Sequence, residues 1–287
     1  MANGYKSVGL AGTLRKAISS FLINAILIVF SITCVYPIFW IIYSSLKTTK
    51  DFNNNPVDLP AKLHFENYVH VITKTLMPRY MLNSVVITVI SLAFILIIGF
   101  ITGYFLSRFK FRGCNMLYAY YIIGMLVPIH ALLVPMYILT KKVGLINTAV
   151  GLILPYVAFG LPIAVFLIDT YVRTIPKEIE EAASIDGASL TRTMFTIILP
   201  ICKPMLVTVG IIQFFACWNE FIFALVLLND QNKFTVPLGL TFFKGPYSTN
   251  YPMIMAAIVT SIVPVMVLYF AFSGNIIKSM TAGAVKE

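Results

Sequence analysis

Long apolar stretches without charged residues dominate the pattern along this chain. Five stretches of 26 to 33 residues contain no Asp, Glu, Lys or Arg, and a sixth of 26 residues contains only Glu220. A helix needs about 20 apolar residues to cross a bilayer, so each stretch is long enough. The pattern predicts six transmembrane helices, at about residues 20–45, 81–106, 115–139, 146–168, 205–228 and 253–277.

The composition supports a membrane protein. Hydrophobic residues make up 59% of the chain and charged residues 11%, whereas a soluble domain carries about 25% charged residues. We expect an all-α integral membrane protein with a six-span domain over residues 20–279, an N-terminal segment at 1–19 and a tail at 280–287. The first apolar stretch is too long for a removable signal peptide, whose apolar region has about 7–15 residues.

The net charge of +10 does not indicate nucleic acid binding, because the basic residues flank the apolar stretches instead of forming a stripe. With both termini cytoplasmic, the inside segments carry 12 of the 21 Lys and Arg residues and the outside segments carry 9. This is a weak bias toward basic residues on the cytoplasmic side, as expected.

The four cysteines lack metal-ligand spacing, so no metal site is expected. The run 234–243 is too short to span and predicts a surface or re-entrant segment.

One polar segment, residues 169–203, interrupts the apolar pattern. Thr174 is a candidate N-cap for a short helix that begins with three glutamates. The helix would carry small and polar residues on one face, and Gly187 would end it with a left-handed bend. A second short helix would follow. From the residues alone, this hairpin either docks a protein or lies on the membrane surface without a partner. The proposed face consists of Ile179, Ala182, Ala183 and Asp186.

The spacing within this hairpin resembles the "EAA" loop of bacterial ABC importer permeases. The pattern has Glu-Ala-Ala, three residues, Gly, nine residues and then Ile-x-Leu-Pro. It is formed by Glu181, Ala182, Ala183, Gly187, Ile197, Leu199 and Pro200, with Asp186 beside the glycine. The resemblance implies that this loop is a coupling helix that docks on a cytoplasmic ATPase. No phosphate-binding G-x-x-x-x-G-K-[ST] motif occurs here, so we expect ATP and Mg to be used by two separate ATPase subunits.

Four further stretches resemble the shorter permease of maltose-type carbohydrate importers: HFENY (64–68), GYFLSRFKFRG (103–113), WNEFIFAL (218–225) and TVPLGL (235–240). This implies a permease without enzymatic activity of its own, in a prokaryotic cytoplasmic membrane. Its partners would be a companion permease, an extracytoplasmic solute-binding protein and membrane lipid, and its cargo a di- or oligosaccharide. A glycerol-phosphate ester importer, or an ion-coupled carrier that uses Glu220, remain the alternatives.

Glu220 is the only charge inside a predicted span. A charge at the centre of a bilayer costs about 3 kcal/mol on insertion scales, so it should face protein or water. Trp218, Asn219 and Glu220 therefore either line the solute pathway or clamp this chain to its companion. The resemblance also implies that the loop 229–252 reaches the solute-binding protein, through Gly239, Phe243, Gly245, Tyr247 and Asn250.

Overall fold

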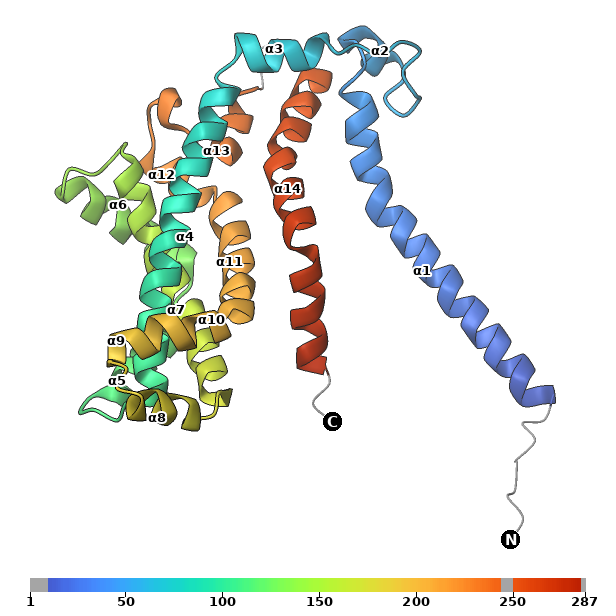
Figure 1. Cartoon of the computed structure of the whole chain (residues 1–287). Coiled ribbons are helices and arrows are strands. Elements are labelled where there is room, and N and C mark those ends of the chain that lie inside the picture. Colours follow the sequence, from blue (N-terminus) through green and yellow to red (C-terminus); the bar gives the residue numbers. More distant parts are fainter. Residues whose placement is uncertain (1–9, 244–249, 285–287) are drawn as a thin grey trace.

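The computed structural model describes residues 10–243 and 250–284, and this part of the chain is helical and contains no strand (Figure 1). The elements are, in order, α1 (Leu10–Ser44), α2 (Thr49–Asn54), α3 (Glu66–Lys74), α4 (Met77–Arg108), α5 (Cys114–Leu126), η1 (Ile129–Leu132), α6 (Leu133–Lys142), α7 (Ala149–Thr174), α8 (Glu178–Ile185), α9 (Leu190–Arg192), the π-helix η2 (Thr193–Ile198), α10 (Leu199–Ile201), α11 (Lys203–Trp218), α12 (Ile222–Leu227), η3 (Gln231–Lys233), α13 (Val236–Leu240), η4 (Thr241–Phe243) and α14 (Tyr251–Ala284).

Four helices are long and apolar enough to cross a membrane as single pieces, namely α4, α7 and the parts Ile18–Ser44 of α1 and Tyr251–Ala271 of α14. Two further helix pairs are apolar enough only when taken together, and each is bent, as in a broken span or a re-entrant loop. The pair Cys114–Leu126 and Ile129–Lys142 is bent by 96°, and the pair Leu190–Ile201 and Lys203–Trp218 by 73°. The described part of the chain therefore holds four straight spans, or up to six when each bent pair counts as one.

The two predicted helices that prove discontinuous are 115–139 and 205–228. The first breaks at Val127, which adopts an extended conformation (φ −74°, ψ 118°) before Pro128. A proline disfavours helical geometry in the residue before it, which explains the break. The second ends at Trp218 and resumes as α12 at Ile222. The helix predicted at 146–168 is continuous, as α7, and extends to Thr174.

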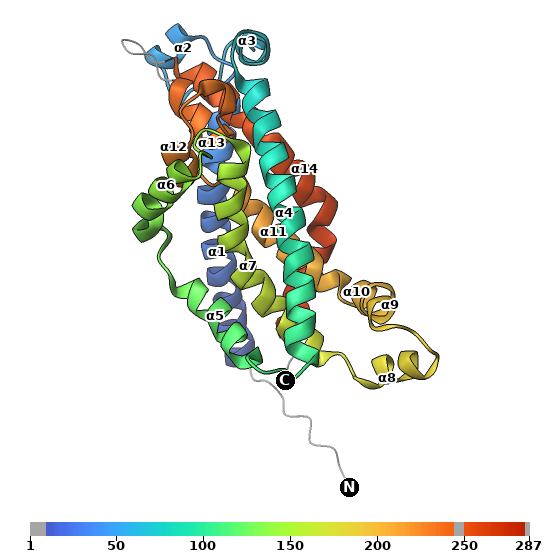
Figure 2. The ribbon, with the colours of Figure 1, turned by 90° about the vertical axis from the view of Figure 1, so that its left-hand side faces the viewer.

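The centre of the fold is the contact between α4 and α7, which run side by side in both ribbon views (Figures 1 and 2). Small residues allow it. A Cβ atom added to Gly99 would lie 3.0 Å from Ala164 Cβ, and one added to Gly103 would lie 2.9 Å from Ile168 Cγ2 and 3.0 Å from the backbone nitrogen of Asp169. Small residues four apart are the usual means by which membrane helices approach closely.

Helix α1 lies apart from the other long helices along most of its length (Figure 1). None of its apolar window is buried inside the described chain. Its described side-chain hydrogen bonds to other elements lie near its C-terminal end, where Trp40 Nε1 donates to Pro56 O (3.0 Å) and Tyr43 Oη donates to Val57 O (2.6 Å). Lys47 is buried beside this point and donates to Asn55 O at 2.9 Å, and burial lowers the pKa of its ammonium group.

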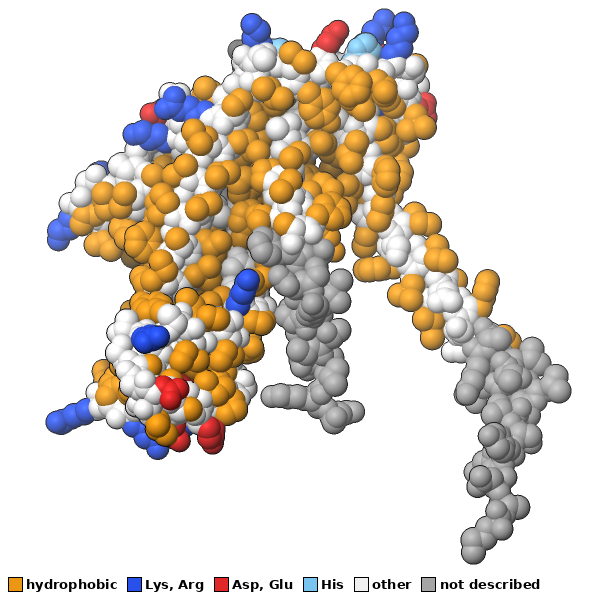
Figure 3. Space-filling model, in the orientation of Figure 1, with side chains coloured by type: hydrophobic (Ala, Val, Ile, Leu, Met, Phe, Trp, Pro, Cys, Tyr) orange, Lys and Arg blue, Asp and Glu red, His pale blue; other side chains and the backbone are white. Residues whose placement is uncertain are grey.

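The charged side chains gather mostly at two ends of the molecule, and hydrophobic side chains cover the middle of the face in Figure 3. We call the end that carries α8 to α10 the hairpin end, and the end that carries α2 and α3 the cap end (Figure 1). The first residues of α1 and the last residues of α14 both lie toward the hairpin end (Figures 1 and 2). Such a distribution suits a protein that crosses a bilayer between these two ends.

The segment 234–243 is a surface segment only in part, because Thr241 and Phe242 are exposed whereas most of its first six residues are buried. Phe234, Val236 and Leu238 are buried at the cap end. Asn83 of α4 fixes the entry to this segment, because its side-chain Nδ2 donates to Asn232 O (2.9 Å) and Phe234 O (3.0 Å). The segment therefore folds back onto the helices instead of standing away from them.

The α4–α7 contact generates a prediction with an internal control. Gly103→Ala should lower the free energy of unfolding by about 1–3 kcal/mol, because the added methyl group meets a side chain and a backbone atom and forces the helices apart. Gly210→Ala in α11 adds the same methyl group where the nearest atom lies 3.9 Å away. This control should be neutral or stabilising by up to about 1 kcal/mol through helix propensity. Thermal unfolding of the purified protein in detergent distinguishes them, and equal melting temperatures would contradict the packing argument.

Candidate functional site: the polar hairpin and the broken helix

The bend predicted at Gly187 is confirmed. Gly187 has φ +79°, and no non-neighbouring atom lies within 4 Å of the position that a Cβ would take. Helix α8 ends there in a Schellman motif, in which Ala188 N donates to Ala183 O (2.9 Å) and Gly187 N donates to Ser184 O (3.0 Å). This motif needs a left-handed residue after the helix, which glycine adopts without a steric penalty.

The start of the hairpin differs from the prediction. Thr174 does not cap α8, because it is the last residue of α7 and its hydroxyl donates to Tyr171 O (2.7 Å). Helix α8 begins after Lys177, whose side chain does not cap it. The proline at 176 keeps the two helices separate, since a residue without an N–H cannot continue α7.

Glu180 fastens α8 to the end of α4. Arg108 Nε donates to Glu180 Oε1 (2.5 Å), and the side chains of Arg108 and Glu180 are only 4% and 17% exposed. Tyr104 Oη donates to the other oxygen of Glu180 (3.1 Å), and a second nitrogen of Arg108 donates to Ile175 O (2.9 Å). Because Arg108 donates through two nitrogens and Glu180 accepts through both oxygens, these charge-assisted bonds fix orientation as well as distance. The hairpin is thus held to the bundle at a defined angle.

The predicted docking face is wrong in one residue. Ala183 is 7% exposed and packs toward the chain itself, so it is not available on an outer face. The glutamate of the motif, Glu181, is exposed, as are Ala182, Asp186 and Gly187. The most prominent apolar side chain is Ile185, which is 86% exposed. Helical spacing told which residues share a face, but it did not tell which face turns inward.

The second half of the hairpin provides its contact with the bundle. Thr193, Met194 and Ile198 of η2 are buried. Ile197 and Leu199 are partly buried and pack against the core, whereas Pro200 is exposed in the first turn of α10. The Ile-x-Leu-Pro part of the motif therefore seats the hairpin, and the Glu-Ala-Ala part faces outward except at its second alanine.

A polar cavity of about 320 Å³ lies between the end of α4 and the two halves of the hairpin. Tyr104, Arg108, Glu180, Ser184 and Thr193 are among the residues that line it. Within the described residues, no group of His, Cys, Asp or Glu is arranged to hold a metal ion. Three of the lining residues, Tyr104, Arg108 and Glu180, form the contacts that hold the hairpin to α4, so the cavity lies beside the mounting of the hairpin.

The second polar site is the break between α11 and α12. Both oxygens of Glu220 accept hydrogen bonds there: Oε1 from Phe223 N (2.6 Å), and Oε2 from Ala224 N (3.2 Å) and from Tyr156 Oη (2.7 Å). The carboxylate thereby satisfies backbone donors at the start of α12 that have no helical partner. Glu220 thus has a role within this chain, which neither of its two predicted roles anticipated.

The neighbours of Glu220 differ from each other. Asn219 is exposed. Trp218 is 4% exposed and its ring stacks on Phe214, with ring centroids 5.6 Å apart. Trp218 is therefore a core residue in this structure, and the prediction that it lines a pathway is corrected.

The residues expected to meet a solute-binding protein are only partly placed. Gly239 is buried, and a Cβ added to it would lie 2.1 Å from Tyr80 Cδ2, so its predicted contact with a partner is wrong. Phe243 is partly buried, and Asn250 accepts from Met253 N (3.1 Å) at the start of α14. Gly245 and Tyr247 lie outside the described residues.

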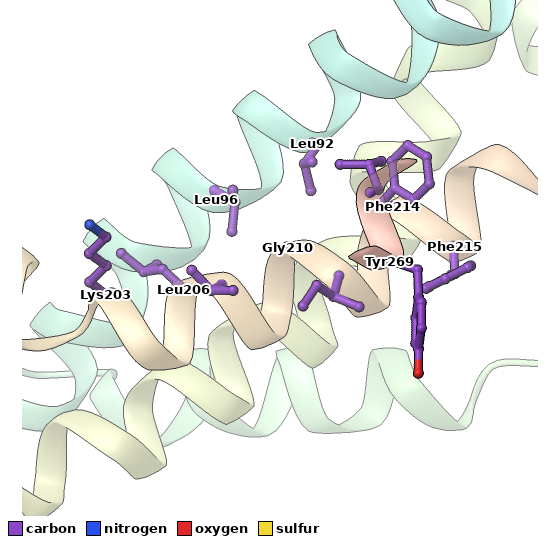
Figure 4. Close-up of a pocket in the computed structure, with 11 residues that line it drawn as sticks. Leu92, Leu96, Lys203, Leu206, Gly210, Phe214, Phe215 and Tyr269 are labelled. Atoms are coloured by element: carbon purple, nitrogen blue, oxygen red, sulfur yellow. The ribbon is translucent and has the colours of Figure 1, made fainter. Parts of the chain in front are cut away.

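A large apolar cavity of about 270 Å³ lies between α4, α11 and α14. Figure 4 shows Lys203 at one end of it and Phe214, Phe215 and Tyr269 toward the other. Leu92, Leu96 and Leu206 line much of the rest. A sugar site needs several converging hydrogen-bonding groups, so this cavity suits hydrocarbon and not a sugar.

Three contacts that position these sites were missed by sequence reasoning. The pairing of Glu180 with Arg108 joins residues 72 positions apart, and that of Glu220 with Tyr156 joins residues 64 apart. No local pattern announces such pairs. The third, the close approach at Gly99 and Gly103, has a readable signal, because G-x-x-x-G within an apolar helix is a helix-contact motif.

Known proteins with similar sequences now identify the chain. Residues 95–281 match the profile of the family described as "Binding-protein-dependent transport system inner membrane component". A putative ABC transporter permease protein of Caldicellulosiruptor is 40% identical over 91% of this chain and 94% of its own. The diacetylchitobiose uptake system permease protein NgcG of Streptomyces coelicolor is 34% identical, over 91% and 87%. The trehalose/maltose transport system permease protein MalG of Thermococcus litoralis is 34% identical, over 92% and 95%.

The fold has a close counterpart among solved structures. One chain of a bacterial ABC transporter involved in the import of the acidic polysaccharide alginate superposes with a TM-score of 0.81, at 22% sequence identity. The match covers 96% of this chain and 99% of that one. The resemblance to ABC importer permeases is thus confirmed by a family match over residues 95–281, and the protein is a transport component and not an enzyme. The chain belongs to the family of binding-protein-dependent transport system inner membrane components, as a permease of the ABC transporter type.

Proposed function

We propose that this permease forms half of the translocation pathway of an ATP-driven importer for a carbohydrate, and that its cargo is a di- or oligosaccharide. The main support for a carbohydrate cargo is the similarity to two permeases named for diacetylchitobiose and for trehalose/maltose. Each similarity extends over more than nine tenths of this chain. An ion-coupled carrier is not supported, because the chain belongs to a binding-protein-dependent family. A glycerol-phosphate ester remains the competing cargo.

In this proposal the chain crosses the membrane six times, with both termini and the hairpin in the cytoplasm. Two observations support it. The start of α1, the end of α14 and α8 lie toward the same end of the molecule (Figure 1). The bent pair α5–α6 and the pair that includes α11 are each apolar enough to count as one crossing. ATP is cytoplasmic, so a hairpin that serves an ATPase belongs on that side.

The hairpin is the proposed coupling element. Its exposed residues, Glu181, Ala182, Ile185 and Asp186, would dock on one of two ATPase subunits, which would bind ATP and Mg. Docking would transmit force because the hairpin is mounted rigidly, by the Glu180–Arg108 pair on one side and by buried η2 residues on the other.

The remaining partners would meet the other surfaces. The unburied apolar length of α1 would lie against the companion permease and lipid. At the cap end, which would be extracytoplasmic, Phe243, Gly245, Tyr247 and Asn250 remain the proposed contacts of a solute-binding protein. Asn219 and Glu220 are the proposed polar residues beside the solute pathway.

The experiment that tests the cargo is stimulation of ATP hydrolysis. The complete complex, reconstituted with its solute-binding protein, would be assayed against a panel of mono-, di- and oligosaccharides and a glycerol-phosphate diester. We expect stimulation by one class of di- or oligosaccharide. Stimulation by the phosphodiester alone would contradict the proposal and favour the competing cargo.

Gly187→Ala should impair coupling through backbone strain alone, since a methyl group there meets no other residue. A left-handed non-glycine residue costs about 1–2 kcal/mol, so we expect a partial loss of solute-stimulated ATPase activity with normal membrane insertion. Gly187→Asn is the matched control, because asparagine tolerates this conformation best among side-chain-bearing residues. Wild-type solute-stimulated ATPase activity in Gly187→Ala would contradict the claim that coupling requires the left-handed conformation at this position.

Glu180→Gln should uncouple the transporter, because it removes the charge that the nearly buried Arg108 faces. Breaking a buried pair from one side costs about 3–5 kcal/mol, and the partial exposure of Glu180 places the expected loss at or below the lower value. Glu178→Gln, an exposed glutamate of the same first turn, is the control. Transport and ATPase activity would be measured side by side. Equal transport and ATPase activity in the two variants would contradict the claim that Glu180 is needed for coupling.

Ile185→Trp separates docking from simple membrane association. A cleft on an ATPase would be blocked by the larger side chain, so ATPase co-purification should fall while the companion permease stays bound. A hairpin that only lay on the membrane surface would accept tryptophan readily, since aromatic residues favour that interface. Ala183→Trp serves as a comparison, because it should disrupt the hairpin itself. Wild-type recovery of the ATPase with Ile185→Trp would defeat the docking assignment.

A further inference from the structure

The break between α11 and α12 lies at an unusual depth. Helix α11 has 16 residues, which makes it about 24 Å long, and the hydrocarbon core of a bilayer is about 30 Å thick. A helix that starts at the cytoplasmic surface therefore ends before it has crossed. Non-helical backbone at such a depth is tolerated only where it is buried in protein or faces water.

The far half of this crossing is fixed to α7 at both of its ends. At its start, Tyr156 of α7 donates to the Glu220 carboxylate that caps α12 (2.7 Å). At its end, Asn147 N, in the turn before α7, donates to Leu227 O (2.8 Å). The side chain of Asn147 also accepts from Asn229 N (3.1 Å) and Asp230 N (3.0 Å). Helix α12 thus belongs to the α7 body, and the break separates it from α11.

Tyr156 has a particular place in this arrangement. It is 5% exposed, and its hydroxyl makes the shorter of the two bonds to Glu220 Oε2. Without it, that oxygen keeps only the 3.2 Å bond from Ala224 N. The carboxylate would then be held only by the backbone bonds from Phe223 N (2.6 Å) and Ala224 N (3.2 Å), and Glu220 would lose its link to α7.

Asn219 is the exposed residue at the break between α11 and α12. It lies between the end of α11 and Glu220 and is exposed. Its side-chain amide makes no hydrogen bond to the described residues, whereas the oxygens of the neighbouring Glu220 are engaged. An exposed and unengaged amide at a broken crossing offers a neutral donor and acceptor to a ligand.

We propose that Tyr156 is a positioning residue for solute passage: it holds Glu220 over the start of α12 and so keeps Asn219 turned toward the pathway. This inference deepens the proposed function and rests on it for the identity of the solute. The chemistry of the site, a neutral amide with the carboxylate charge already satisfied, suits the hydroxyl groups of an uncharged sugar.

The first test is Tyr156→Phe, which removes one hydroxyl group from a buried ring. The control is Tyr171→Phe on the same helix, whose hydroxyl makes only a 3.4 Å contact with Ile201 O. For a disaccharide that stimulates the wild-type complex, we expect KM to rise about threefold to tenfold with Tyr156→Phe, as for the net loss of one typical hydrogen bond. Basal ATPase activity and the yield of complex should not change, which a purely structural role would not predict.

The second test does not depend on the solute. Asn219→Cys, in a background with Cys34→Ser and Cys114→Ser, would be labelled with a charged thiol reagent. Adding Tyr156→Phe should change the labelling rate at least about threefold, and adding Tyr171→Phe should not. Glu220→Gln should change the labelling rate in the same way. The double variant should label at the same rate as Glu220→Gln alone, because both substitutions act on the Tyr156–Glu220 contact.

The outcomes are distinguishable. Unchanged labelling and unchanged KM with Tyr156→Phe would overturn the inference. A labelling change in a complex that no sugar stimulates would overturn the carbohydrate proposal and leave the positioning role standing. If Tyr156→Phe fails to assemble, unchanged labelling with Glu220→Gln would still overturn it.

Discussion

The close approach of α4 and α7 is the contact on which the rest of this permease depends. Gly99 and Gly103 leave no room for even a methyl group against α7, so the two helices are held at one distance along their shared length. Lipid tails are as apolar as leucine, and a membrane helix pair therefore relies on packing of this kind and not on hydrophobic exclusion. Each helix of the pair also makes one long-range side-chain contact. Arg108 at the end of α4 receives the hairpin, and Tyr156 on α7 receives Glu220.

The polar groups follow a single physical rule, which is that buried donors and acceptors must be paired. Charged residues inside the bundle are few, and each is bonded to a specific partner. Asp169, 1% exposed, accepts two bonds from Arg173, and Glu180 accepts from Arg108 and Tyr104. Such pairs cost free energy to bury and add little to stability. The use of the Glu180 contacts is geometric, because they join α8 to α4, whereas Asp169 and Arg173 pair within α7.

Sequence reasoning reached the class of fold, the family and the bend at Gly187, because long charge-free runs, motif spacing and an Asp-Gly pair are local signals. It failed where the answer depends on three-dimensional neighbours. Ala183 shares a helical face with Ile179, but periodicity cannot say that this alanine turns toward η2. Gly239 looked like a loop glycine and is instead the small residue under Tyr80. The 96° bend at Val127 also goes beyond what a proline in the sequence implies, since many membrane helices continue past one.

The central claim is that a rigidly mounted hairpin delivers the motion of an ATPase to a permease built around α4 and α7. Its most direct test is disulfide-length crosslinking in the assembled complex, from cysteine introduced at Asp186 to cysteines placed along the surface cleft of the ATPase subunit. Lys142, at the far end of α6, provides the control position. The account predicts crosslinks from position 186 that change in pattern when ATP is bound, and none from position 142. Absence of any crosslink from position 186 in a complex that transports its solute would contradict it.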